Sequence, residues 1–281
     1  MNYYCLIAGL PEIEFDAGKT VFSIADFKKE VRPQLSEKDA RTIDLFFTKF
    51  DNQNLLHYLK NKEATFDLRG NLSKEDMEEG IRLIGEGDDP KNKYFPPYFK
   101  PFIEKYKDVQ HIDLGNAHWE DCLTDLYYRW AMQSDNKFVA KWYEFNLNLN
   151  NILAAYTGRK YQMEPAPVGD NEVAESIKTS NQRDFGLTGI IDELDMFQRI
   201  AEESDLFERE KKIDIMKWQR LDEQTFFKYF GIESVFAYLI KIEIIERWAN
   251  LNPEEGEKIF RGLINNLKEN VVHGREAVNH Q

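Results

Sequence analysis

The stretch 134–161 constrains the fold more than any other part of the chain. Its large apolar residues recur at spacings of three and four, which is the period of one buried helix face: Phe138, Trp142, Phe145, Leu149, Ile152 and Tyr156. Ser134 or Asp135 can cap the start of this helix. Tyr143 and Leu147 fall on the opposite side of the helical wheel, so the helix is apolar on two faces. We therefore expect it to lie buried in the middle of a helical domain.

Asparagines lie between the two apolar faces of this helix: Asn146, Asn148, Asn150 and Asn151. Each lowers helix propensity by roughly 0.6 kcal/mol relative to alanine. Buried amides need hydrogen-bond partners, and four of them within six residues indicate that these side chains bind neighbouring groups. The simplest interpretation is that they hold nearby loops in place.

The composition is typical of a globular protein. The chain has 281 residues, of which 42% are hydrophobic, and it can bury a sizeable core despite a net charge of −13. This charge and the lack of a basic stripe argue against binding to nucleic acid and against binding to an anionic membrane surface. No run reaches the roughly eighteen apolar residues of a membrane span, so we expect no direct membrane insertion. Cys5 and Cys122 are too isolated for a disulfide framework or a CxxC zinc site, which favours a reducing cytoplasm.

Helix signals follow one another along the chain, without a hairpin series or a βαβ alternation. Ser36 with Asp39 forms a capping-box-like start of a long helix, and Ser73 with Asp76 opens a shorter one. Further helices are expected at 117–133, 134–157, 187–204, 205–218, 222–250 and 252–267. The polar segment 159–186, broken by prolines, is the best candidate for a linker. The predicted fold class is all-α, as a single helical domain over 1–281 with expected subdomains 1–110, 111–186 and 187–281.

Two aromatic segments leave alternatives open. The opening residues 1–11 are too short for periodicity to separate a strand from one buried helical turn. Residues 85–101 form a loop rich in proline, glycine and aromatic side chains. These aromatic side chains could form a docking patch, but such a loop more often packs onto its own core: Tyr94, Phe95, Tyr98 and Phe99.

None of the motifs that carry enzyme chemistry is complete in this sequence. The AGKT at 17–20 lacks the glycine that a phosphate-binding loop needs five residues earlier, where Ile13 stands. We therefore expect no ATP binding at this loop. Three residues could meet around a metal ion, although solvated loop residues are the simpler interpretation: His111, Asp113 and His118. We expect no enzymatic activity, no cofactor and no small-molecule ligand.

A loose internal repeat links three of the expected helices. Each copy carries two polar residues three positions apart, on one helix face, near an apolar and aromatic stretch: Asp51 and Asn54, Asn148 and Asn151, Glu243 and Glu246. The second members of these pairs are 97 and 95 residues apart. Polar groups on apolar helices are costly to bury unless they bind something. Each pair is therefore expected to hold a loop or a helix end, which is a structural role.

The same residues carry a resemblance to a known family. The pattern consists of a polar residue, an asparagine three positions later, a following Ile or Leu and a basic end. It is similar to the repeated helix of the C-subunit of V-type ATP synthases, which is the relative of the d-subunit of vacuolar ATPases. The opening YYCLIAGLP, residues 3–11, resembles more specifically a bacterial family of unknown function. The genes of that family lie among those for V-type ATPase subunits, where its members take the place of the C-subunit. This second match covers the whole chain, including the C-terminal YLIKIEIIERW. The third copy departs from the motif, since Glu246 stands where it prefers asparagine.

The resemblance implies an all-α funnel of three pseudo-symmetric helical subdomains. Such a protein would be a non-catalytic central-stalk subunit that couples the shaft to the membrane rotor ring of a V-type ATPase or ATP synthase. Its partners would be the shaft subunits and the ring, and it would be cytoplasmic and peripheral to the inner membrane through them. Two alternatives stay open. One is a cytoplasmic helical adaptor unrelated to ATPases, and the other is an all-α hydrolase with a metal at His111 and His118.

Overall fold

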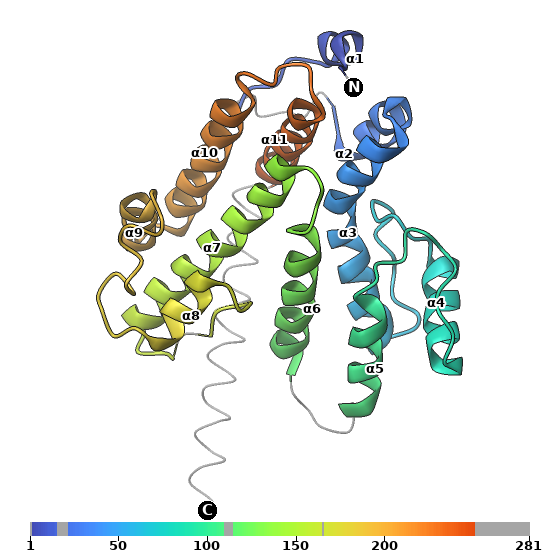
Figure 1. Ribbon diagram of the computed structural model, residues 1–281, viewed down its shortest axis with the longest axis horizontal. Coiled ribbons are helices and arrows are strands. Elements are labelled where there is room, and N and C mark those ends of the chain that lie inside the picture. The colour runs from blue at the N-terminus through green and yellow to red at the C-terminus, as the bar shows by residue number, and fades with distance from the viewer. Residues whose placement is uncertain (1, 16–21, 110–114, 165, 251–281) are drawn as a thin grey trace, which may run out of the picture.

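The described part of the chain consists of helices joined by loops and contains no β-strand. The computed structural model describes residues 2–15, 22–109, 115–164 and 166–250 (Figure 1). Its helices are α1 (Tyr4–Gly9), α2 (Ile24–Asp26) with the π-helical turn Phe27–Val31 and the 3-10 turn Arg32–Gln34, α3 (Glu37–Lys60), α4 (Lys74–Glu86), α5 (Phe99–Val109), α6 (Gly115–Ala131), α7 (Lys137–Lys160), α8 (Glu172–Thr179), α9 (Leu194–Glu202), α10 (Leu206–Thr225) and α11 (Ile232–Asn250). The all-α prediction is confirmed for these residues. None of the helices described is long and apolar enough to cross a membrane. The helix expected at 252–267 lies outside the described residues.

Capping residues set the starts of α3 and α4 as the sequence predicts. The Ser36 hydroxyl accepts a hydrogen bond from the Asp39 backbone N–H at 3.2 Å, at the start of α3. At α4 the bonds are reciprocal, because Ser73 accepts from the Asp76 N–H and the Asp76 carboxylate accepts from the Ser73 N–H. Such caps satisfy N–H groups that the helix leaves without partners, and each contributes about 1 kcal/mol.

Several boundaries differ from the prediction for local reasons. The first turn of α7 is capped by Asn136, not by Ser134 or Asp135, because the Asn136 Oδ1 accepts from two N–H groups of that turn. The predicted linker 159–186 contains the helix α8, so its prolines do not make the whole segment irregular. α9 occupies only the second half of the range 187–204. The opening residues form the helical turn α1 rather than a strand.

The aromatic loop before α5 packs onto the protein's own core. Tyr98 is buried, and its hydroxyl donates to Asn52 Oδ1 at 2.6 Å. The Arg32 guanidinium donates to the Tyr94 hydroxyl at 3.2 Å and faces its ring. α5 is an addition to the expected helices, because Pro101 obscures its signal. This proline lies in the first turn, where its missing N–H loses no helical hydrogen bond.

α7 lies in the middle of the molecule and packs against α6, α8, α9 and α11 (Figure 1). Phe145 meets the ring of Phe197 of α9, and Tyr143 meets Phe236 of α11. Trp142 keeps only 4% of its surface exposed. The core is therefore continuous across α7, and the prediction of a helix buried on two faces is confirmed.

The order of helices repeats along the described chain. The long helix α3 is followed by a loop, the shorter α4, then α5 and α6. The long helix α7 is likewise followed by a loop, the shorter α8, then α9 and α10. α11 stands where a third such unit would begin (Figure 1). This order starts each unit at its long helix, and the expected subdomains 1–110, 111–186 and 187–281 stay a prediction.

We expect Trp142→Ala to lower the free energy of unfolding by roughly 3–5 kcal/mol, because it removes a large buried side chain and leaves a cavity. Chemical denaturation followed by circular dichroism measures this change. Tyr161→Ala is the control, since this ring lies at the end of the same helix with 65% of its surface exposed. That variant should change the free energy of unfolding by less than about 0.5 kcal/mol. A Trp142→Ala curve that overlays the wild-type curve would show that the core lies elsewhere.

Candidate functional site

The first predicted polar pair holds the loop between α3 and α4. Asn54 exchanges two hydrogen bonds with the backbone of Asp67, since its Nδ2 donates to the carbonyl at 3.0 Å and its Oδ1 accepts from the N–H at 2.7 Å. The Asp51 carboxylate accepts from the N–H groups of Asn71 and Leu72, both at 3.0 Å. Both side chains of the pair are buried. α3 thereby fixes the loop that leads into α4.

The second pair makes a similar tether on α7. Asn151 exchanges two hydrogen bonds with the backbone of Val168, since its Nδ2 donates to the carbonyl at 2.8 Å and its Oδ1 accepts from the N–H at 2.9 Å. The Asn148 Oδ1 accepts from the side-chain amide of Asn171 at 2.7 Å, and Asn171 caps α8. Asn54 and Asn151 thus make the same two bonds to one residue of the loop that follows their own helix.

The third pair has different neighbours. Glu243 forms an ion pair with Lys49 of α3 in the interior of the molecule. Glu246 accepts a hydrogen bond from the Ile24 N–H at 2.7 Å, at the start of α2. Neither acid holds a loop that follows α11 among the described residues. The third pair instead joins α11 to α3 and to the N-terminal part of the chain.

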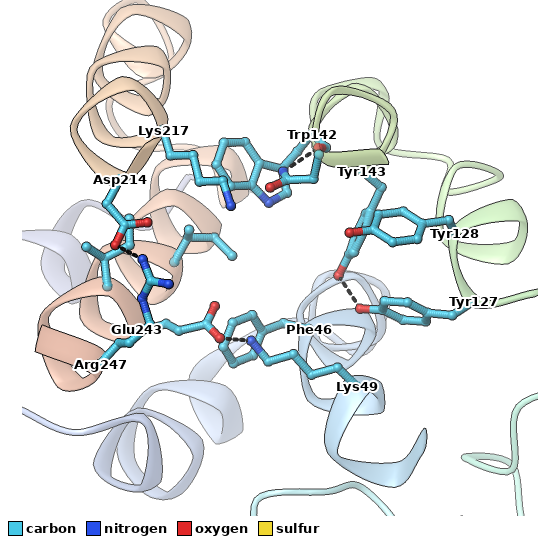
Figure 2. A pocket seen from close by; sticks show the side chains of 13 residues that line it. Phe46, Lys49, Tyr127, Tyr128, Trp142, Tyr143, Asp214, Lys217, Glu243 and Arg247 are labelled. Atoms are coloured by element: carbon cyan, nitrogen blue, oxygen red, sulfur yellow. Dashed lines mark hydrogen bonds and ion pairs between the residues drawn. The ribbon is translucent and has the colours of Figure 1, made fainter. Parts of the chain in front are cut away.

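A central cavity of about 210 Å³ lies among α3, α6, α7, α10 and α11 (Figure 2). One part of its wall is aromatic and consists of Phe46, Tyr127, Tyr128, Trp142 and Tyr143. Another part is charged and consists of Lys49, Asp214, Lys217, Glu243 and Arg247. Charged groups from helices distant in the sequence therefore meet at the centre of the fold.

Each carboxylate of the cavity is paired with a cation. Lys49 pairs with Glu243 across α3 and α11. Arg247 pairs with Asp214, and Asp214 also accepts a hydrogen bond from the Trp248 Nε1 at 2.7 Å. Burial lowers the pKa of Lys49, and the neighbouring Glu243 opposes this change. These pairs tie α11 to α3 and to α10.

Lys217 is the third cation of the cavity. Its side chain extends into the cavity from α10 (Figure 2), and its Nζ makes no hydrogen bond or ion pair with a residue that the structure describes. Burial lowers the pKa of Lys217, and the negative charges of Asp214 and Glu243 oppose this change. Among the described lining residues, three cations therefore face two carboxylates.

The cavity also gives a register for the three long helices. Each presents one pair of comparable positions to it: Phe46 and Lys49 from α3, Tyr143 and Asn146 from α7, Ile240 and Glu243 from α11. Successive pairs are separated by 97 residues, since 143 − 46 = 97 and 240 − 143 = 97. On this register Glu243 corresponds to Asn146, which is two residues from the expected match with Asn148. The position that corresponds to Asn151 is then Trp248, whose side chain carries no amide.

The remaining candidates for chemistry lie mostly outside the described residues. His111, Asp113 and the AGKT at 17–20 fall in segments that the structure does not describe. His118 is exposed on α6, with its ring against Trp119. In the part of the chain that is described, no group of three potential ligands is placed to hold a metal ion.

α1 lies beside the turn between α10 and α11 (Figure 1), and exposed aromatic side chains lie on both segments. We call this surface the aromatic tip, and its members are Tyr4, Phe226, Phe227 and Tyr229, with 53%, 69%, 93% and 66% of their surfaces exposed. The Tyr4 ring lies 4.3 Å from that of Phe230, and the Tyr3 N–H donates to the Phe230 carbonyl at 2.8 Å. The tip is not evident from the sequence, because the apolar run 226–230 continues the pattern of the helix expected at 222–250.

One family model matches almost the whole chain. It is described as "Protein of unknown function (DUF2764)" and covers residues 1–271. No curated protein and no solved structure matches the chain significantly.

We expect Asn54→Leu and Asn151→Leu each to lower the free energy of unfolding by about 1–3 kcal/mol, because each leaves partly buried backbone groups of the loop without partners. Chemical denaturation measures both losses. Gln53→Leu, at the exposed neighbouring position of α3, is the matched control and should stay within about 0.5 kcal/mol of the wild type. A loss at only one of the two asparagines would contradict their equivalence.

A pH dependence is expected from Asp51. Burial raises the pKa of this carboxyl to about 6, although hydrogen bonds from Leu72 and Asn71 and the charge of Lys28 oppose the shift. The pKa in the unfolded chain is about 3.9, so the contribution of Asp51 to stability is fully present below that pH. It is lost as the pH rises through about 6.

Between pH of about 4 and about 6, the free energy of unfolding of the wild type should therefore fall by up to about 3 kcal/mol relative to Asp51→Asn. Denaturation curves across this range measure the difference in slope, which is independent of any constant offset between the proteins. Asp88→Asn, in an exposed loop, controls for the loss of one negative charge. Parallel pH profiles of the wild type and Asp51→Asn would show that this carboxylate is well solvated.

Proposed function

The chain belongs to the DUF2764 family of proteins of unknown function, and we propose that it is a non-catalytic coupling subunit of a V-type ATPase or ATP synthase. In this role it would stand between the soluble shaft and the membrane rotor ring and transmit torque by shape and contact. The observation that carries the proposal is the shared tether on α3 and α7, in which Asn54 and Asn151 make the same two bonds. These are the helices through which the chain resembles the C-subunit of V-type ATP synthases.

The tethers suit a protein that must keep its shape under load. Each one returns a loop to its own long helix, over 13 residues from Asn54 to Asp67 and over 17 residues from Asn151 to Val168. Because the side chains of Asn54 and Asn151 are buried, opening a loop would leave these amides without partners. Fixed loops leave the long helices as the elements that carry force between the two ends of the molecule.

Contacts between distant elements add to this stiffness. The ion pair of Lys49 with Glu243 joins α3 to α11, and the bond from Ile24 to Glu246 joins α2 to α11. The Tyr238 hydroxyl donates to the carbonyl of Pro11 at 2.8 Å, again linking α11 to the N-terminal part. The units are therefore held to one another across the fold and not only through the chain.

The aromatic tip is the surface through which we propose that this protein binds the rest of the assembly. Protein interfaces are enriched in aromatic residues, and exposed apolar patches mark interaction sites. Phe226 and Phe227 are held out by the turn between two long helices, with 69% and 93% of their surfaces exposed. Lys228 is the only charged residue in the run 226–230 of an otherwise strongly acidic protein.

We expect subunits of a V-type ATPase to co-purify with the chain in stoichiometric amounts. The measurement is affinity purification from detergent-solubilised membranes of the native host, with a C-terminal tag, followed by quantitative mass spectrometry. The double variant Phe226→Ser, Phe227→Ser should lose roughly 90% or more of these subunits, as truncation of interface anchors does. Its melting temperature should be nearly unchanged, because both rings are exposed. Leu68→Ser, with 90% of the Leu68 surface exposed, is the control for loss of an apolar side chain elsewhere.

Absence of ATPase subunits from the wild-type preparation would contradict the proposed function. Their retention by the double variant would contradict the role of the aromatic tip and leave the coupling role itself intact. If a different soluble protein is retained in their place, and is lost with the double variant, the adaptor alternative replaces the ATPase role.

A further inference from the structure

Lys217 brings a cation into the central cavity, and its Nζ forms no ion pair with a described residue. The nearest carboxylate on its own helix, Asp214, is held by Arg247. The other carboxylate of the cavity, Glu243, is held by Lys49. A third acid, Glu210, also pairs with Arg247, at 3.0 Å. The carboxylates around Lys217 are therefore held by Arg247 and Lys49, and none of them forms an ion pair with the Lys217 Nζ.

Other groups face Lys217 from every helix around the cavity: Glu210 and Asp214 of α10, Glu243 and Arg247 of α11, Lys49 of α3, Tyr127 and Tyr128 of α6, and Tyr143 of α7. The acids favour the charged lysine, but loss of water outweighs them and lowers the pKa of Lys217. An ammonium without a counter-ion in such a place can be relieved in two ways. It can lose its proton, or it can take up an anion.

A second hollow, of about 580 Å³, shares Lys217 and Arg247 with the cavity and lies between α7 and α10. Arg209 also lines it, about two turns before Lys217 on α10. The Nε of Arg209 is buried and has no hydrogen-bond partner in the described part of the chain, while its Nη2 lies 3.3 Å from the Thr157 hydroxyl. Buried N–H groups without partners are unusual in proteins, and a guanidinium N–H is a strong donor to oxyanions.

We propose that Lys217 is the principal donor of a binding site for a small oxyanion, of the phosphate, sulfate or carboxylate class. The anion would reach it through the hollow lined by Arg209 and give both the Lys217 Nζ and the Arg209 Nε a direct partner. This site departs from the expectation of no small-molecule ligand. Its donors Lys217, Arg209 and Arg247 belong neither to the aromatic tip nor to the amide tethers, although Asn151 also lines the hollow. The site can therefore be tested separately from the proposed coupling role.

The test is binding of inorganic phosphate, sulfate and malonate at constant ionic strength set with chloride, by calorimetry and thermal denaturation. We expect the Tm of the wild type to rise by about 3–6 °C at a tenfold excess of anion over Kd. The three anions distinguish phosphate from carboxylate recognition. Sulfate has no pKa near neutrality, so any proton taken up when sulfate binds must go to a group of the protein. We expect such uptake, and weaker binding as the pH rises, because the anion raises the pKa of Lys217.

Variants of α10 separate the site from general charge effects. Lys217→Met should abolish the anion-dependent rise in Tm, while its Tm without anion should equal or exceed that of the wild type because an unpaired charge is removed. Lys217→Arg should retain the rise. Lys212→Met is the matched control, since Lys212 is exposed on the same helix and pairs with Glu203. It should respond to anions as the wild type does.

An equal response of Lys217→Met and the wild type would overturn the proposal, as would the lack of any anion-specific rise in the wild type. If Lys217→Met does not fold, NMR of the 13C-methylated lysines of the wild type decides. The signal of Lys217 should then shift with sulfate, and an unchanged signal would overturn the site.

Discussion

An amide buried on an apolar helix must find both a donor and an acceptor, and in this protein it finds them in the loop that follows its own helix. Asn54 meets both needs with one residue, Asp67, and Asn151 does so with Val168. Each bond adds only about 1 kcal/mol when formed, but leaving its partners buried and unpaired costs up to about 3 kcal/mol. This asymmetry makes the loop conformations obligatory. The positions of α4 and α8 follow from them, because each of these helices begins at the end of a tethered loop.

The elements that follow from local chemistry could be predicted from the sequence. The spacing of aromatic residues shows α7, and the side chains of Ser36 and Ser73 mark the starts of α3 and α4. The failures have local causes too. Pro101 obscures α5, since composition does not distinguish a first-turn proline from a helix breaker. The apolar run 226–230 obscures the turn before α11, because its rings are exposed where the pattern suggests burial.

The cavity could not have been found in this way. Its charged residues come from α3, α10 and α11, and their pairing depends on how these helices pack. With 50 acidic and 37 basic residues in the chain, any acid can be matched to a base on paper. The sequence indicates that Lys217 lies on a helix rich in charge. Only the fold shows that both neighbouring carboxylates are already held by other cations.

The register set by the cavity gives the departure of α11 a physical reason. The corresponding positions on α3, α7 and α11 hold a cation, an amide and an anion, namely Lys49, Asn146 and Glu243. The amide donates back to the Trp142 carbonyl of its own helix at 2.7 Å. The cation and the anion need each other, and their pairing brings α11 against α3. Three identical residues could not form this pair, because like charges repel and amides are satisfied locally. The difference between the copies therefore adds an ion pair between α3 and α11 to the hydrophobic core that these helices share.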